Sequence, residues 1–280
     1  MLKHDSLAYP AANNGVSARC RIQVHVPFSY LEERLLSIFI KEKINPEISF
    51  NSFELDTFKA DDFRRIADAL LTAGLSITLH APFMDLRPGA VDEKIRQASI
   101  HRFQQVFDIA PFFCPKSIVC HPSFDKRYYV SSESKWLENS LTTWRNFLPE
   151  AEALGTIIAF ENVYETEPDM LAALVDSLGS RYARICFDTG HFNVFGRSPL
   201  EEWIQGIGDR ISQVHLHDNH ARLDEHLPVG EGIFPFRNFF LMLRDLHIHP
   251  ILTVEPHSEK DLWKTLINIE KMELLEIGDF

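Results

Sequence analysis

RIQVHVPFSYLEERLLSIFIKEKINPEISFNS, residues 21–52, joins two runs rich in β-branched and apolar residues through an amphipathic segment. This order predicts a strand, a helix and a second strand. The pattern continues along the chain, which has eight strand candidates, at 21–28, 46–52, 76–83, 117–123, 156–163, 183–191, 211–218 and 251–257. Amphipathic helix candidates lie between them, such as 29–44, 61–74, 92–113 and 236–247, and another follows at 259–275. Eight strand–helix pairs in about 250 residues predict an α/β fold, a single (β/α)8 TIM barrel.

An open, doubly wound sheet is the alternative architecture, but no G-x-G-x-x-G motif follows the first predicted strand. No low-complexity linker, repeated block or shift in composition divides the chain. We therefore expect one barrel domain over residues 20–280, preceded by a flexible segment at 1–19.

Composition narrows the classes of partner and compartment. The 280 residues include 28 Lys and Arg against 40 Asp and Glu, a net charge of −12. Such a surface repels polyphosphate chains and anionic membranes, so nucleic acid and membranes are not the expected partners. The cysteines show no C-x-x-C spacing, which fits a reducing compartment. With neither a signal-peptide core nor about 18 consecutive apolar residues, the protein is expected to be cytoplasmic.

Ionisable side chains recur at the ends of the predicted strands, where barrel enzymes keep their chemistry. A single imidazole at such a position is most often a hydrogen-bonded partner of the backbone or of a carboxylate. Six successive strands that each end in an imidazole or a carboxylate indicate a shared metal site, because zinc, manganese and iron prefer these ligands. The nine candidate ligands are His80, His121, Glu161, Asp188, His191, His215, Asp224, His226 and Glu255.

The stretch VHLHDNHARLDEHLPVGEG, residues 214–232, contains four histidines and two aspartates. Taken alone, it is as consistent with a solvated loop as with the rim of a metal site. Gly230 and Gly232 are expected to let the backbone turn back close beneath the cluster, the alternative being an ordinary loop turn.

Seven short motifs occur in order between residues 79 and 256, namely LHAPF, CHPS, FENV, FDTGH, HLHDN, DEHLPVGEG and VEP. Their order and spacing resemble the xylose isomerase-like TIM barrel superfamily, which also contains endonuclease IV, the AP endonuclease family 2 fold. The resemblance covers residues 20–270. Its most specific part is D-x-H-x-x-x-G-x-G after H-x-x-D, together with an upstream D-T-x-H.

The endonuclease IV pattern implies a trinuclear centre with three ligand sets. These are His80, His121 and Glu161 for the first metal; Glu161, Asp188, His215 and Glu255 for the second; and His191, Asp224 and His226 for the third. His217 stands where that enzyme class has an asparagine, and with Asp218 it is expected to orient ligands rather than bind metal. His25 is expected to face the same mouth, either touching substrate or lying beneath the cluster as a satisfied polar residue.

The number of metals separates two reaction classes. Isomerases and epimerases of this superfamily resemble the second ligand set alone, in which one ion polarises a carbonyl or hydroxyl and carboxylates move protons. All nine ligands suit phosphoester hydrolysis, in which one ion lowers the pKa of a bound water toward about 7 and its neighbours neutralise the phosphoryl group. We expect a phosphodiesterase with about two to three zinc, manganese or iron ions, and Glu161, Glu255 and His191 as its catalytic residues. The alternatives are a sugar or sugar-phosphate isomerase or epimerase with one metal, and a non-catalytic metal-binding module.

The acidic chain favours a small-molecule diester over duplex DNA, which leaves an AP endonuclease as a further alternative. Phe83 is expected to line a small-molecule pocket, although with Met84 it also fits the wedge of a minor-groove protein. Other expected substrate contacts are a basic and aromatic patch, Arg87, Lys126, Arg127 and Tyr128. Asn162, which follows Glu161, is expected either to orient ligands or to contact substrate. HAPFMDLRPGA and EPHSEKDLW also look like the cobamide-remodelling phosphodiesterases of the superfamily, which implies a nucleotide- or cobamide-like substrate. The sequence does not indicate the oligomeric state.

Overall fold

Eight parallel strands close into a barrel in the computed structural model, which describes residues 21–278. Each strand pairs with the next in sequence, and β1 pairs with β8 to complete the ring. The strands are β1 (Ile22–Pro27), β2 (Asn45–Ser49), β3 (Thr78–His80), β4 (Ser117–Cys120), β5 (Ile157–Glu161), β6 (Ala183–Asp188), β7 (Ile211–Leu216) and β8 (Ile251–Val254). The predicted (β/α)8 TIM barrel is therefore confirmed. The predicted flexible segment at 1–19 lies outside the described residues.

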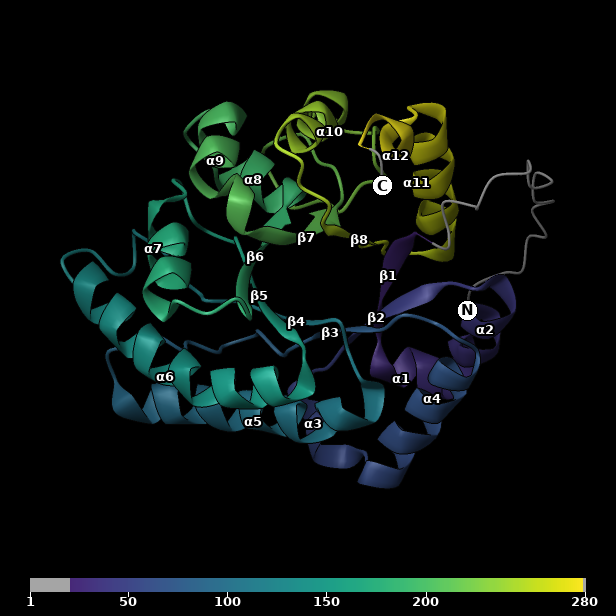
Figure 1. Ribbon diagram of the computed structural model, residues 1–280, viewed down its shortest axis with the longest axis horizontal. Helices are drawn as coiled ribbons and strands as arrows, with labels where there is room; N and C mark the ends of the chain where they lie inside the picture. The colour runs from purple at the N-terminus through teal and green to yellow at the C-terminus, as the bar shows by residue number, and fades with distance from the viewer. Residues whose placement is uncertain (1–20, 279–280) are drawn as a thin grey trace.

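Helices surround the barrel on its outer side (Figure 1). They are α1 (Phe28–Tyr30), α2 (Leu36–Glu42), α3 (Ser52–Thr57), α4 (Ala60–Thr72), α5 (Glu93–Phe113), α6 (Glu133–Leu154), α7 (Asp169–Leu178), α8 (Thr189–Phe195), α9 (Leu200–Ile207), α10 (Phe236–Asp245), α11 (Glu259–Lys271) and α12 (Leu274–Ile277). A π-helical turn, Leu31–Leu35, joins α1 to α2, and a 3-10 turn, Gly208–Arg210, follows α9. The longer helices are held by one apolar face, as in α4, where the buried Phe63, Ile66 and Leu70 recur at helical spacing.

Several elements differ in length from the sequence-based prediction. The strands predicted at 76–83, 117–123 and 251–257 end earlier, at His80, Cys120 and Val254. Each of these segments contains a proline that cannot donate to the sheet. The segment predicted as strand 183–191 turns at Asp188 into α8. The helix predicted at 29–44 is interrupted by its π-helical turn. The helix predicted at 259–275 is broken near Glu273, whose φ is 55°.

Residues on each strand alternate between two environments. Ile118, Ile158 and Ile185 belong to the main hydrophobic core, which packs the barrel against its helices. Their neighbours Val119, Ala159 and Cys186 form a separate small cluster of the opposite parity. Inside the barrel the side chains are also polar, and Glu47, Thr78, Ser117, Gln213 and Thr253 are all buried there and joined by hydrogen bonds.

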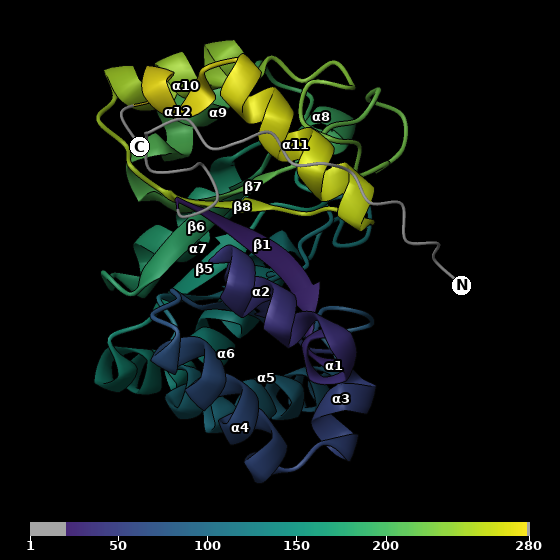
Figure 2. The same ribbon diagram turned by 90° about the vertical axis from the view of Figure 1, so that its right-hand side faces the viewer.

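All eight strands run the same way, so their carboxyl ends meet at one end of the barrel. β6 runs directly into α8, and the loop that follows β7 lies near this helix (Figure 2). This end therefore brings together residues that are far apart in the sequence. Among residues 21–278, no helix has the length and apolar character needed to cross a membrane.

Candidate metal centre

The nine candidate ligands come from the carboxyl ends of the strands and from the segments that directly follow them. His80, Glu161 and Asp188 are the last residues of β3, β5 and β6. His215 lies in β7, while His121 and Glu255 directly follow β4 and β8. The other three are on the loop side of the same end: His191 in α8, and Asp224 and His226 in the loop after β7.

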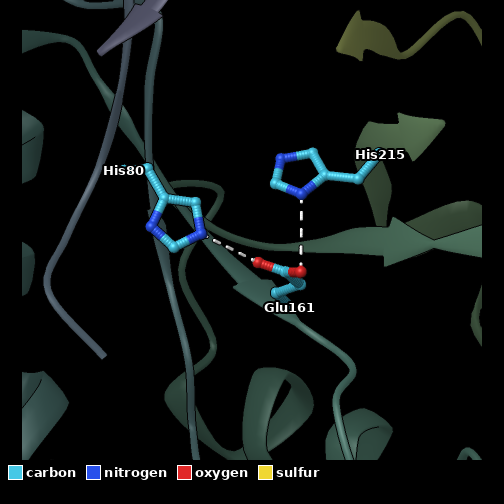
Figure 3. Close-up of side chains that lie close together, drawn as sticks. All are labelled: His80, Glu161 and His215. Carbon is cyan, nitrogen blue, oxygen red and sulfur yellow. Dashed lines mark hydrogen bonds and ion pairs between the residues drawn. The ribbon is translucent and has the colours of Figure 1, made fainter. Parts of the chain in front are cut away.

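Glu161 lies at the centre of this cluster and is almost completely buried. Its Oε2 faces His80 Nε2 at 3.2 Å and His121 Nε2 at 3.0 Å. Its Oε1 faces His191 Nδ1 at 3.2 Å and His215 Nδ1 at 3.4 Å. Figure 3 shows the carboxylate between His80 and His215, which approach it from different strands. One carboxylate therefore meets four imidazoles, with two of them at each of its oxygens.

His215 is the centre of a second group. Its Nδ1 lies 3.1 Å from Glu255 Oε1 and 3.8 Å from Asp188 Oδ2, in addition to its approach to Glu161. The imidazole is fully buried. Neither of its ring nitrogens has a well-aligned hydrogen bond within the described part of the chain. Three carboxylates thus converge on the Nδ1 atom of one buried imidazole that has no aligned hydrogen bond.

A third group lies where α8 meets the loop after β7. Asp224 Oδ2 is 3.3 Å from His191 Nε2 and 3.1 Å from His226 Nε2. The turn from β6 into α8 positions His191, because the Asp188 side chain caps the helix and accepts a hydrogen bond from the His191 backbone N–H at 2.6 Å. The motif FDTGH therefore places an aspartate and a histidine side by side at the mouth.

Asp218 shapes the loop that carries Asp224 and His226. Its Oδ2 accepts hydrogen bonds from the backbone N–H groups of Gly230 and Gly232 at 3.1 and 2.8 Å. Its Oδ1 accepts from the N–H of Phe234 at 3.0 Å. A Cβ atom at Gly232 would lie 2.4 Å from this carboxylate, so glycine is needed there. Within the loop, Asp218 thus acts on the backbone of residues 230–234.

His217 and Asn162 contact the candidate ligands Asp188, His191 and His226. The Nε2 of His217 is 3.0 Å from Asp188 Oδ2, and its ring stacks on His226 with centroids 3.9 Å apart. The Asn162 side chain donates to the backbone oxygen of Asp188 and accepts from its N–H, at 3.0 and 2.8 Å. The Asn162 carbonyl is 3.0 Å from His191 Nδ1. Both residues therefore contact candidate ligands directly.

The charges of the cluster depend on one another. Burial alone would raise the pKa of the Glu161 carboxyl, but the charges of His215 and His121 outweigh it and hold that pKa well below its usual range. Burial likewise lowers the pKa of His226, yet the hydrogen bond to Asp224 and the charge of Glu255 raise it to about 9. Ionised carboxylates surrounding nitrogen donors form an environment that favours cations.

The residues present fit divalent metal ions. Among residues 21–278, four groups each bring three donor atoms within 4.8 Å of one another: His80, Glu161 and His215; Asp188, His191 and His217; His217, Asp224 and His226; and Glu47, His215 and Glu255. Imidazole nitrogen and carboxylate oxygen suit zinc, manganese and iron alike. The buried Nδ1 of His215, which faces carboxylates but lacks an aligned hydrogen bond, is further reason to expect a cation at this position.

The predicted substrate contacts lie on the rim of the mouth or next to the cluster. Phe83 stacks on His121 with ring centroids 4.6 Å apart and remains 42% exposed. His25 meets the edge of His80 at 5.6 Å. In the patch, the Arg87 guanidinium lies 4.4 Å from the centre of the exposed Tyr128 ring. The side chain of Arg127 is held by Asp125 through two hydrogen bonds, and Lys126 is exposed. Arg87 and Tyr128 are thus brought together, whereas Arg127 already has an acidic partner.

Two residues close to the cluster were not among the sequence-predicted site residues. Glu47, in the middle of β2, faces His215. His257 stacks on His226 with centroids 4.4 Å apart. A signal existed for both, because Glu47 is a carboxylate inside an apolar strand candidate and His257 follows Glu255 at a spacing of two residues.

A barrel with histidines and carboxylates at its mouth defines a class of protein, and similarity to known proteins identifies that class. The chain belongs to the xylose isomerase-like TIM barrel family, whose model matches residues 44–273. The uncharacterized protein MJ1311 of Methanocaldococcus jannaschii is 30% identical over 68% of each chain. A probable endonuclease 4 of Mycobacterium leprae is 25% identical over 63% of this chain and 71% of its own length. The crystal structure of a D-tagatose 3-epimerase-like protein is 27% identical and superposes with a TM-score of 0.75 over 92% of this chain and 98% of that chain. The predicted resemblance is confirmed, and the named relatives include both an endonuclease and an epimerase-like protein.

Proposed function

We propose that this protein is a divalent-metal-dependent phosphodiesterase with a multinuclear, trinuclear centre at the mouth of its barrel. The observation that carries the proposal is the position of Glu161, whose two oxygens face four imidazoles at 3.0–3.4 Å. A mononuclear site built on the second ligand set has no need of His80 and His121 so close to that carboxylate. The similarity to a probable endonuclease 4 supports the same reaction class.

The nine residues divide into the three proposed ligand sets. His80 and His121 would bind the first ion with Glu161; Glu161, Asp188, His215 and Glu255 the second; and His191, Asp224 and His226 the third. Metal ions in such a centre activate water for attack and neutralise charge on the phosphoryl and leaving groups. The carboxylates and imidazoles of the chain would hold these metal ions in place. Glu161, Glu255 and His191 are the proposed catalytic residues.

A small diester is the proposed substrate class. The net charge of −12 disfavours a duplex, whose binding depends on neutralising many phosphates. Arg87 against Tyr128, with Phe83 over His121, offers one cation and two exposed aromatic rings on the rim. This suits a single phosphate next to a planar group, as in a nucleotide- or cobamide-like molecule.

A sugar epimerase or isomerase is the second candidate function. It is favoured by the D-tagatose 3-epimerase-like structure, which is 27% identical and is covered over 98% of its length. In that case Glu161 and Glu255, which both face His215, would stand on either side of a substrate carbon. The first and third ligand sets would then not be needed for activity.

The test is a comparison of substrates on the metal-loaded protein. Wild type would be assayed with bis(p-nitrophenyl) phosphate, a dinucleotide, a cobamide, abasic duplex DNA, D-tagatose and D-fructose. His121→Ala is the decisive variant, because His121 belongs only to the first ligand set, and His101→Ala, an exposed histidine on α5, is its control. The proposal expects diester hydrolysis that falls about a hundredfold in His121→Ala. Epimerisation of a sugar that survives His121→Ala would replace it with the second candidate, and cleavage confined to abasic DNA would make the protein an AP endonuclease.

A further inference from the structure

A carboxylate lies inside the barrel, beneath the candidate metal centre. Glu47 is in the middle of β2, and its side chain is fully buried. Burying an ionised carboxylate is costly unless other groups compensate for the lost water. It is not one of the nine candidate ligands, so its presence in the barrel interior needs its own explanation.

One oxygen of Glu47 is surrounded by hydrogen-bond donors from other strands. Its Oε2 accepts from the Thr78 hydroxyl of β3 at 2.9 Å and from the Thr253 hydroxyl of β8 at 3.2 Å. It also accepts from the Gln213 side-chain amide of β7. An amide nitrogen can only donate, and its orientation is set by Ser117, whose hydroxyl donates to the Gln213 oxygen. These donors fix the carboxylate and favour its ionised form.

The other oxygen of Glu47 faces His215. Its Oε1 is 3.0 Å from His215 Nε2, and neither atom has a well-aligned hydrogen bond to any of the described residues. The opposite ring nitrogen of His215, Nδ1, faces Glu255 and Glu161 at 3.1 and 3.4 Å. The imidazole therefore stands between a carboxylate outside the proposed ligand sets and the carboxylates of the second set.

We propose that Glu47 is a positioning residue for His215: it takes the hydrogen bond from Nε2 and so leaves the Nδ1 lone pair directed at the metal shared with Glu161, Asp188 and Glu255. A carboxylate behind a metal-binding imidazole fixes the tautomer and the ring orientation and makes the imidazole a better ligand. This inference rests on the proposed metal site. It holds for either candidate reaction, because both use the second ligand set.

The experiment compares metal binding by Glu47→Gln and Glu54→Gln. Glu54 is a matched control, since it is equally buried and its carboxylate accepts backbone hydrogen bonds from Ser29 and Asn51 at 2.8 and 2.9 Å, but it caps α3. Metal-free protein would be titrated with Co²⁺, whose visible absorption reports ligand geometry, and with Zn²⁺ against a chelator. We expect Glu47→Gln to weaken one ion by about ten- to hundredfold, with altered Co²⁺ bands. Glu54→Gln should leave both unchanged.

A second measurement does not depend on a variant that folds. In zinc-loaded wild type labelled with ¹⁵N-histidine, His215 should carry its proton on Nε2, in a strong hydrogen bond that shifts this proton downfield. A proton on Nδ1 would overturn the proposal. So would a Glu47→Gln protein that binds every ion as tightly as Glu54→Gln does. If wild type itself binds no divalent ion, the proposed function falls together with this inference, whereas tight binding in wild type with no effect of Glu47→Gln removes the inference alone.

Discussion

A Cβ atom at Gly190 would lie 2.0 Å from Cε1 of His217, so the imidazole occupies the space that a side chain at residue 190 would take. His217 is buried against this glycine and reaches Asp188 through its Nε2 at 3.0 Å. The glycine inside FDTGH and the second histidine of HLHDN are therefore parts of one packing arrangement.

Gly190→Ala is expected to displace His217 and to loosen Asp188, a proposed ligand of the second ion. Overpacking of this kind costs about 1–3 kcal/mol of the free energy of unfolding. The measurements are urea unfolding and metal content. The cost should largely disappear in a His217→Ala background, where the ring is gone. Gly206→Ala, in α9, is the control, since its Cβ would meet only Pro168 at 3.2 Å. Equal costs in both backgrounds would show that the clash does not involve His217.

Glu161→Gln tests the bridging role of the central carboxylate. Gln keeps the shape but removes the charge that faces His121 and His215 at 3.0 and 3.4 Å. We expect weaker binding of two ions at once and a loss of hydrolysis, measured by elemental analysis and diester assay. Glu152→Gln, on the exposed face of α6, is the control. Full activity in Glu161→Gln would contradict the trinuclear scheme.

His226→Ala should empty mainly the third site. His226 Nε2 is 3.1 Å from Asp224 Oδ2, and among the described residues His226 forms no ion pair with Glu161. Elemental analysis of freshly purified protein is expected to show about three ions in wild type and about two in the variant. His220→Ala, an exposed histidine of the same loop, should keep the wild-type content. A single ion, unchanged by His226→Ala, would favour the epimerase.

Asp218→Asn should loosen the loop after β7 while leaving the strands intact. The carboxylate accepts from the N–H groups of Gly230, Gly232 and Phe234, and its charge strengthens all three hydrogen bonds. We expect a loss of about 1–3 kcal/mol of local stability, seen as faster hydrogen exchange at these amides, and weaker binding of the third ion. Unchanged hydrogen exchange would mean that the conformation of the loop does not depend on the charge of Asp218.

The ionisable residues that lie at the mouth of the barrel could be predicted from the sequence, because alternation along a strand is a local property. His80, Glu161 and Asp188 each follow a β-branched or apolar run, and a closed parallel barrel sends such residues to one mouth. Glu47 could not be placed in the same way. Its partners come from β3, β7 and β8, and only the register of the closed sheet brings them to it.

The packing of His217 could not be predicted from the sequence alone either. A histidine in place of the asparagine of the endonuclease IV pattern was visible in the sequence, but the space left for its ring by Gly190 depends on the packing of α8 against β7. Element boundaries failed for a local reason, since Pro82, Pro122 and Pro256 end three of the strand candidates early.

Glu165 should make the stability of the protein depend on pH. Burial raises the pKa of its carboxyl from 4.5 to about 7, although the backbone N–H of Val163, which donates to Oε2 at 2.6 Å, opposes the change. The folded protein therefore holds this proton more tightly than the unfolded chain does. The resulting stabilisation, on the order of 3 kcal/mol, is complete below pH 4.5 and is lost as the pH rises to about 7.

Glu165→Gln removes this titration and keeps an oxygen that can accept from Val163. The free energy of unfolding of the variant minus that of wild type should rise by on the order of 3 kcal/mol as the pH increases from 4.5 to 8. Urea unfolding of both metal-free proteins at several pH values measures the difference, in which the titration of the histidine cluster cancels because both proteins share it. A difference that does not change with pH would mean that the pKa of Glu165 is the same in the folded and the unfolded protein, so that the hydrogen bond from Val163 offsets the cost of burial.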